Sequence, residues 1–272
     1  MTKIKLWYPN DLFDKNQRGS WFELIKSRER FERKNNKLDG TIQNQIEWVD
    51  SLVKADALIL PLDWSYYYAR KTQKLAIKFC EDANSFGKIV LSNSGGDQGI
   101  TVPVPNNTIV YRQSGYRSKK KVNERTIPFF LSDPITEFLN IKEETIFNSD
   151  QDELPVVGFC GMAPHGPIAA IKERAQIIVR NLKSIFKLSP GDTQDVLSSS
   201  NLRYQTLESF KSSEAFKANY LIRQKYRGGE QSAENRKKTT KEYYQNQLDA
   251  SLVICVRGVG NFSLRFYETL AM

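Results

Sequence analysis

The sequence has few of the residues that build metal sites. Among its 272 residues there is one histidine, His165, and there are three cysteines, Cys80, Cys160 and Cys255. The cysteines do not have metal-ligand spacing, and with a single histidine they exclude a zinc site built from these residue types. Two of the cysteines lie in apolar strand-like runs, which predicts buried thiols in a reducing compartment.

Long apolar runs, internal repeats and low-complexity tracts are also missing. No stretch is long enough to span a bilayer, and residues 1–9 lack the apolar core of a signal peptide. We therefore expect a soluble cytoplasmic protein. A peripheral position on the inner face of the membrane is left open.

Positive charge is in excess. The chain carries 40 Lys and Arg against 31 Asp and Glu, a formal charge of +9. This charge favours anionic partners, such as nucleotide phosphates, acidic lipid headgroups or nucleic acid; an ordinary basic surface is the alternative. Hydrophobic residues make up 40% of the chain and can fill a core, so the composition does not indicate disorder.

The first half of the chain alternates between strand and helix patterns. Its helical patterns include Ile42, Ile46, Val49 and Val53, at helical spacing. Such alternation predicts a parallel sheet covered on both faces. We therefore expect a Rossmann-like domain over 1–135, with about five strands near 4–8, 57–62, 89–91, 108–111 and 126–131.

A second unit follows a polar and acidic connector. Residues 136–153 have no strand period and are interpreted as a linker. The domain predicted over 154–272 opens with a strand near 154–160 and closes with a helix over 233–248 and a strand over 252–256. Residues 210–222 show no clear pattern. An amphipathic helix follows the first strand of this domain, with apolar positions at Ile168, Ile171, Ala175, Ile178 and Leu182.

The last eighteen residues combine a strand, a glycine loop and the start of a helix. Phe262, Phe266 and Leu270 lie at helical spacing, and Ser263 is placed to cap the first turn. A helix N-terminus with Arg257 and Arg265 beside it suits a phosphate group, because guanidinium groups bind phosphate oxygens bidentately. The chain stops inside this helix, so we expect it to be a fragment of a longer protein.

This closing stretch resembles the signature of exostosin-type glycosyltransferases (family GT47 and its bacterial relatives). That signature runs from an apolar strand through Arg-Gly and a short loop to Ser-x-Arg-Phe-x-Glu-x-Leu, and it is matched by Arg257-Gly258 and by 263–270. Two weaker similarities extend it. Residues 55–62 are similar to the family's strand that ends in the interdomain cleft, and 157–161 to the strand that opens its second domain.

The resemblance implies a GT-B fold, in which two Rossmann-like domains face each other across a cleft and the nucleotide-sugar binds mainly to the second. The second domain would be incomplete. Arg257 and Arg265 would neutralise the donor diphosphate without a metal, and Glu268 would bind the ribose. The alternative for Arg265 and Glu268 is a simple pair across one helical turn. The expected donor-binding residues are Arg257, Gly258, Asn261, Ser263, Arg265, Glu268, Gly161, His165 and Arg227.

Inverting transfer needs a base that takes the proton of the acceptor hydroxyl. Asp63 and Asp97 are the candidates, because both follow strands of the first domain. Trp64 and the tyrosines at 66–68 offer aromatic faces for a sugar ring. The alternatives are a helix N-cap for Asp63 and turn chemistry for Asp97.

The resemblance thus implies a metal-independent, inverting glycosyltransferase that needs no cofactor. Its expected partners are a nucleotide-sugar donor and a glycan or lipid-linked saccharide acceptor, with peripheral contact to an anionic membrane. An inactive or incomplete glycan-binding relative is the alternative function. A basic nucleic-acid-binding protein is less favoured, because no recognition motif for nucleic acid is present, and nucleic acid is therefore not an expected partner.

Overall fold

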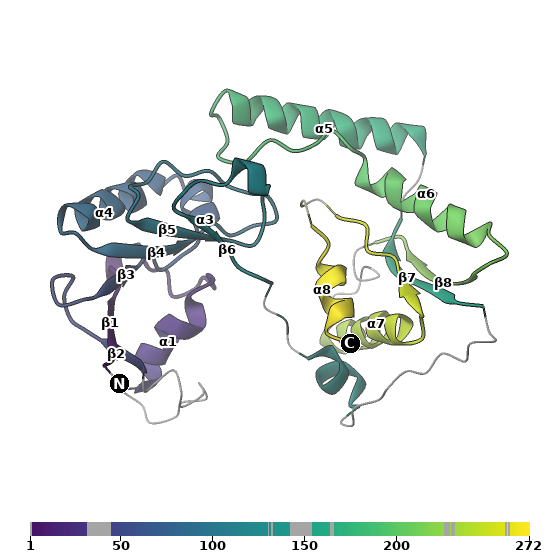
Figure 1. The fold of residues 1–272 in the computed structure, drawn as a ribbon, viewed down its shortest axis with the longest axis horizontal. Helices are drawn as coiled ribbons and strands as arrows, with labels where there is room; N and C mark the ends of the chain where they lie inside the picture. Colours follow the sequence, from purple (N-terminus) through teal and green to yellow (C-terminus); the bar gives the residue numbers. More distant parts are fainter. Residues whose placement is uncertain are drawn as a thin grey trace. The chain divides into compact units, whose positions relative to one another are not determined.

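The computed structural model describes residues 2–31, 45–129, 131, 133–141, 154–163, 166–225, 229, 232–258, 260 and 262–272. The chain forms two compact units (Figure 1). The first unit contains residues 1–128 and 184–192, and the second contains 129–183 and 193–272. The predicted boundaries at 135 and 153 remain predictions, since most of 136–153 lies outside the described residues.

The first unit is a six-stranded parallel sheet, so the prediction of an α/β fold with parallel strands is confirmed. The strand order is β2-β1-β3-β4-β5-β6. The sheet reverses direction of growth between β1 and β3, because β2 is added on one side of β1 and all later strands on the other. The strands are β1 (Ile4–Trp7), β2 (Ile46–Trp48), β3 (Ala57–Ile59), β4 (Ile89–Asn93), β5 (Thr108–Arg112) and β6 (Glu124–Thr126).

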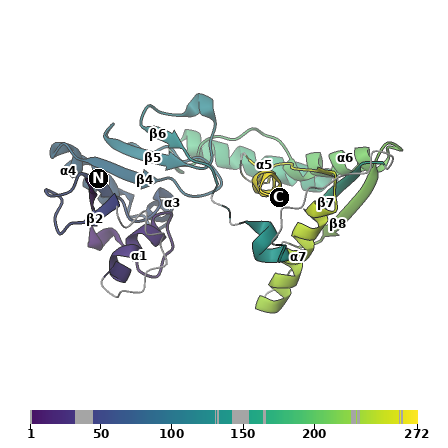
Figure 2. The same cartoon turned by 60° about the horizontal axis from the view of Figure 1, so that its bottom comes forward.

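Helices cover both faces of this sheet (Figure 2). Successive residues of β3 show why, because side chains alternate between the faces of a strand. Leu58 joins the core formed with α3 (Trp64–Ala69) and α4 (Gln73–Ser85). Ile59 joins a second core, together with Ile25 of α1 (Phe22–Phe31). Two short 3-10 helices, η1 (Asn10–Leu12) and η2 (Arg117–Lys119), lie in the connections.

The helix predicted from Ile42, Ile46, Val49 and Val53 is wrong where the structure describes it. Residues 46–48 form β2, which pairs in parallel with β1 through Ile4 and Ile46. Val49 is buried in the core on the α4 side, and Val53 is exposed in a turn. Pairing with β1 decided the conformation here, since a helical spacing of four apolar residues is only a weak local preference.

A later segment of the chain belongs to the first unit. Residues 184–192 return to it, and a buried ion-pair network holds their end: Arg112 donates from Nη1 to Glu124 at 2.6 Å and from Nη2 to Asp192. Asp192 also accepts a hydrogen bond from the Thr101 hydroxyl at 2.7 Å. Both carboxylates are therefore compensated, as buried charges must be.

The second unit is built on a three-stranded parallel sheet in the order β8-β7-β9. Val157 and Phe159 of β7 face a core shared with Leu207 of α6, while α7 lies against the other side of the strand. β8 falls in the region where the sequence shows no clear pattern. All of its residues are exposed or only partly buried, so the strand shows no clear alternation of apolar and polar residues. The elements are η3 (a π-helix, Ile135–Leu139), β7 (Val156–Met162), α5 (Pro167–Ile185), α6 (Ser199–Lys211), β8 (Lys217–Arg223), α7 (Ala233–Leu248), β9 (Leu252–Val253) and α8 (Leu264–Leu270).

Candidate active site

A pocket lies at the carboxyl ends of β1 and β3 in the first unit. It has a volume of about 280 Å³. One wall comes from the loop after β1, and the other from the segment that joins β3 to α3 and from the first turn of α3. Because the direction of sheet growth reverses between these two strands, the pocket occupies the position where open parallel α/β sheets bind ligands. Its lining residues are Gln17, Arg18, Gly19, Leu62, Asp63, Ser65 and Tyr66.

Among the residues that the structure describes, Asp63 is the one carboxylate that lines this pocket. It occupies the N-cap position of α3, but its side chain makes no capping hydrogen bond. Instead, Oδ1 accepts a hydrogen bond of 3.0 Å from the backbone N–H of Ser20. Burial raises the pKa of Asp63 above its ordinary value, and the Ser20 contacts offset only part of that rise. The carboxylate is thus a stronger base than an exposed aspartate.

Two tyrosines of α3 tie the walls of the pocket together. The hydroxyl of Tyr67 donates to the carbonyl oxygen of Leu12 at 3.0 Å and accepts from the backbone N–H of Leu62 at 3.3 Å. The hydroxyl of Tyr66 donates to Asp14 at 2.9 Å. These bonds link the loop after β1 to the start of α3. The position of Asp63 is therefore fixed by its surroundings.

Two of the neighbouring aromatic side chains cannot stack on a sugar ring, contrary to the prediction from the sequence. Trp64 and Tyr67 are buried in the core, with exposed fractions of 0% and 1%, so neither can stack on a sugar. The Trp64 ring instead donates its N–H to the hydroxyl of Ser92 at 3.1 Å and anchors α3 to the sheet. Of the aromatic residues that the sequence singled out, Tyr66 is the one that lines the pocket.

The glycine loop after β4 also reaches this site. Gly95 has a φ of +64°, and a Cβ atom there would lie 2.5 Å from the Ser65 hydroxyl and 2.7 Å from the Cβ of Asp63. Only glycine allows both the backbone conformation and this close approach. The second candidate base, Asp97, lies two residues further along the loop and is exposed.

In the second unit, Arg265 lies among the carboxyl ends of two strands. Its Nη2 donates to the carbonyl oxygen of Cys160 at 2.6 Å, and its Nη1 to that of Ile254 at 3.0 Å. The guanidinium carbon is 4.4 Å from the centre of the Phe159 ring, within reach of a cation–π interaction. Arg265 thus joins α8 to β7 and to the residue after β9. This contact also explains Gly161, where a Cβ would lie 2.9 Å from Nη2 of Arg265.

Glu268 pairs with tyrosines of α7 and not with Arg265. Its two oxygens accept hydrogen bonds from the hydroxyls of Tyr243, at 2.5 Å, and Tyr244, at 3.2 Å. The Tyr243 hydroxyl also accepts a weak bond of 3.4 Å from Nε of Arg265. Burial, with a contribution from Glu268, raises the pKa of Tyr243, so its hydroxyl stays protonated and bridges the two charges. The predicted alternative, a direct pair across one helical turn, is not formed.

Arg203 of α6 is a third basic residue at this end of the sheet. It donates to the carbonyl oxygens of Met162, at 2.5 Å, and Arg257, at 3.1 Å. Burial and then the charge of Arg265 lower its pKa. Sequence reasoning missed Arg203 and Tyr243, because each lies on a helix with no motif around it. Only packing brings them beside Arg265.

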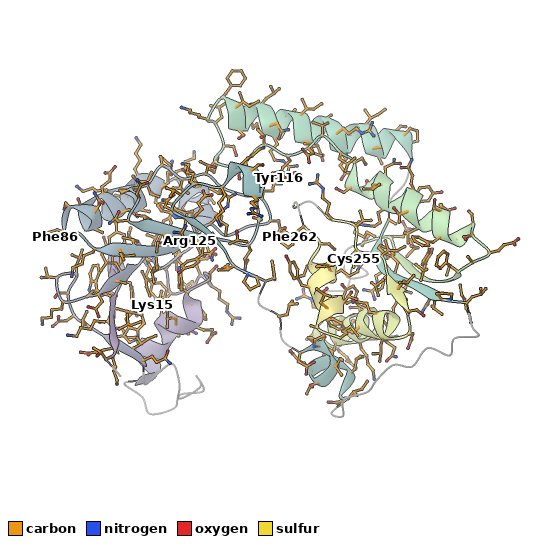
Figure 3. All side chains as sticks on the ribbon, in the orientation of Figure 1. Lys15, Phe86, Tyr116, Arg125, Cys255 and Phe262 are labelled. Atoms are coloured by element: carbon orange, nitrogen blue, oxygen red, sulfur yellow. The ribbon has the colours of Figure 1, made fainter. Side chains whose placement is uncertain are left out.

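Of the remaining predicted donor-binding residues, Arg257, Gly258 and Ser263 lie between β9 and α8. Ser263 occupies the N-cap position of α8 but makes no side-chain cap hydrogen bond, Arg257 is half-buried, and Gly258 is exposed. Figure 3 labels Phe262 in this loop and Cys255 after β9. The other three predicted residues, Asn261, His165 and Arg227, lie outside the described residues.

The prediction of buried thiols is confirmed for one of the two cysteines in apolar strand-like runs. Cys160 in β7 is buried, whereas Cys255 after β9 is only partly buried. Cys80 on α4 is also buried, and all three cysteines are free. Burial raises the pKa of Cys80 to about 12, so this thiol is not a nucleophile at neutral pH.

Both clusters lie at carboxyl ends of parallel strands, and each has titratable side chains in a partly buried setting. Comparisons of the chain with models of protein families, with curated proteins and with solved structures find no match.

Proposed function

We propose that this protein is a glycosyltransferase that moves a sugar from a nucleotide-sugar donor to a hydroxyl group of a saccharide acceptor. In this proposal the two Rossmann-like units form a GT-B-type enzyme related to the exostosin-type transferases. The first unit receives the acceptor and the second receives the donor. Two parallel α/β units, each with charged residues at the carboxyl ends of its strands, support this assignment.

The observation that carries the proposal is Asp63 in its pocket. An acceptor hydroxyl that hydrogen-bonds to the Asp63 carboxylate would lose its proton to it as the oxygen attacks the anomeric carbon of the donor. The bond from that carbon to the nucleotide diphosphate breaks, and the diphosphate departs with the electron pair. The raised pKa of Asp63 favours this role, because a stronger base accepts the proton more readily.

The basic residues of the second unit suit the leaving diphosphate. The guanidinium groups of Arg203 and Arg265 gather positive charge at the ends of β7 and β9. Arg265 uses three contacts within the unit, whereas a guanidinium has five N–H donors. The N–H groups beyond those three contacts would bind phosphate oxygens, together with Arg257 and the Ser263 hydroxyl.

One observation favours the alternative of a glycan-binding protein without transferase activity. Glu268, which we expected to hold the donor ribose, has both oxygens engaged by Tyr243 and Tyr244. A ribose diol would have to displace at least one tyrosine hydroxyl. If this displacement does not occur, the pocket at Asp63 would bind a saccharide without turning it over.

The Asp63→Asn variant tests the proposal. Wild-type protein is incubated with a panel of UDP- and GDP-sugars and oligosaccharide acceptors, and release of nucleotide diphosphate is measured. We expect Asp63→Asn to lower kcat by about 10²- to 10⁴-fold, the usual contribution of a general base. Donor affinity, measured by calorimetry, should stay within about twofold of wild type, because Asp63 does not bind the donor.

Asp97→Asn is the matched control, since Asp97 is the exposed aspartate of the nearby glycine loop. It should keep wild-type activity. If Asp97→Asn lost as much activity as Asp63→Asn, Asp63 could not be assigned as the base and Asp97 would become the candidate. A wild-type chain that binds oligosaccharides but releases no diphosphate with any donor would support the glycan-binding alternative.

A further inference from the structure

Helix α5 presents a row of apolar side chains to solvent. The exposed fractions are 81% for Ile168, 65% for Ile171, 46% for Ile178, 52% for Val179 and 47% for Leu182. At 100° of rotation per residue these five positions fall within an arc of about 100°, so they form one stripe along the helix. We call these five residues the α5 stripe.

The stripe does not hold α5 in place, because the opposite side of the helix does. Ala170 and Ile177 are buried there. The Glu173 carboxylate accepts hydrogen bonds from the hydroxyls of Ser198, at 2.6 Å, and Ser200, at 2.5 Å. Asn181 exchanges two hydrogen bonds with the backbone of Gln194, of 2.7 and 2.8 Å. The stripe is thus an apolar surface beyond what the unit itself uses.

Basic side chains flank the stripe on both sides. Lys172 and Lys183 project from one flank and Arg174 from the other, and all three are exposed. Glu173 is the one acidic residue of α5, and Ser198 and Ser200 bind it on the packed side. The surface is therefore apolar along its middle and cationic along its edges.

This distribution decides between the kinds of partner that could cover the stripe. A second copy of α5 would bring its own cations against Lys172, Arg174 and Lys183. Nucleic acid would satisfy the cations and leave five apolar side chains in water. An anionic bilayer matches both features, because its acyl region takes apolar side chains and its headgroups attract lysine and arginine.

We propose that α5 is a membrane-docking helix that lies in the plane of a bilayer carrying anionic headgroups, with the α5 stripe toward the acyl chains. None of the helices in the described parts of the chain is long and apolar enough to cross a membrane. Docking on the surface is therefore the form of attachment that α5 offers. This proposal rests on α5 alone and does not depend on the transferase activity.

Co-sedimentation with lipid vesicles tests it. The full chain is mixed with vesicles of phosphatidylcholine alone, or with added phosphatidylglycerol. We expect strong binding only when phosphatidylglycerol is present, and weaker binding as salt is raised. Ile171→Ser with Ile178→Ser should reduce the affinity on the order of tenfold or more, because two apolar side chains no longer enter the bilayer. Lys172→Gln with Arg174→Gln should reduce it about thirtyfold.

Leu75→Ser with Phe86→Ser is the matched control. These side chains belong to the first unit, are comparably exposed, and should leave vesicle binding unchanged (Figure 3 labels Phe86). Circular dichroism confirms that each variant is folded. Failure of wild-type protein to bind phosphatidylglycerol vesicles would overturn the proposal, as would full binding by the double serine variant of α5. A wild-type dimer that the same variant converts to monomer, with vesicle binding unaffected, would assign the stripe to self-association instead.

Discussion

The charged side chains at the strand ends of the two units differ in how fully hydrogen bonds compensate their charge. In the second unit, Arg265 donates to two backbone carbonyls, and Glu268 accepts from two tyrosine hydroxyls. In the first unit, the partly buried Asp63 carboxylate accepts from the backbone N–H of Ser20, and its pKa is still raised. The Arg265 cluster is therefore suited to stabilise the fold. The ionised form of Asp63 is disfavoured by its site, which is the property expected of a functional group.

The largest change in stability is expected when Arg265 is removed. Arg265→Ala leaves the carbonyl oxygens of Cys160 and Ile254 without their cationic donor, and we expect a loss of about 3 kcal/mol in the stability of the second unit. Arg265→Lys should retain part of this, because lysine keeps the charge but not the planar arrangement of donors. Stability is measured by urea unfolding.

The tryptophans make the two units distinguishable in this experiment. All four, at positions 7, 21, 48 and 64, lie in the first unit. The fluorescence transition should therefore stay at its wild-type midpoint, while the transition seen by circular dichroism shows an early component from the second unit. A variant with wild-type unfolding that no longer binds nucleotide-sugars would show that Arg265 serves only the donor.

A smaller effect is expected from Tyr243→Phe. Its hydroxyl bridges Glu268, at 2.5 Å, and Arg265, at 3.4 Å, so its removal should cost about 1 to 2 kcal/mol. Tyr244→Phe is the control, since it removes one longer bond of 3.2 Å to the same carboxylate and should cost less. Equal losses in the two variants, measured by the same urea titration, would argue against the bridge.

The smallest expected effect is a gain in stability, in the Asp63→Asn variant. The folded-state pKa of Asp63 is raised, so the folded protein binds this proton more tightly than the unfolded chain does. Stability is therefore lost as pH rises from the ordinary aspartate pKa through the raised value. The Asp63→Asn variant does not have this pH-dependent loss of stability. Its thermal unfolding midpoint, followed by fluorescence, should therefore be higher than that of wild type at pH 7. Near the ordinary aspartate pKa the two midpoints should be similar.

Asp14→Asn supplies the contrast. The backbone N–H of Asn16 and the hydroxyl of Tyr66 lower the pKa of Asp14, so its contribution is present above the ordinary aspartate pKa and lost at lower pH. This variant should therefore be slightly less stable than wild type at pH 7. A lower thermal midpoint for Asp63→Asn at pH 7 would contradict the unfavourable environment inferred for Asp63.

Several elements could be predicted from local pattern. The helix expected over 233–248 is α7, and the strands near 4–8, 89–91 and 108–111 are β1, β4 and β5. The three strands have apolar alternation or apolar runs, whereas α7 has little apolar periodicity. β2 was predicted as part of a helix and β8 had no assignment, because short or half-exposed strands depend on their pairing partners for stability.

The position of Asp63 after a strand made it a candidate from sequence, but its value as a base could not be judged there. Its burial depends on Gly19, Gly95 and α3, which come together only in the folded unit. Similarly, the helical spacing of apolar residues in α5 was visible in the sequence. Which side of that helix would be covered was not, since periodicity identifies a face and not its neighbour.

The sequence by itself determined the alternation of strands and helices, and with it a parallel α/β architecture in two successive parts. It also determined the basic charge and the location of the candidate residues at strand ends. Tertiary structure decided that Asp63 is partly buried in a pocket, that Glu268 binds tyrosines, and that the α5 stripe faces solvent. The reason is physical: local preferences act over a few residues, whereas desolvation and hydrogen-bond partners are set by groups far apart in the chain.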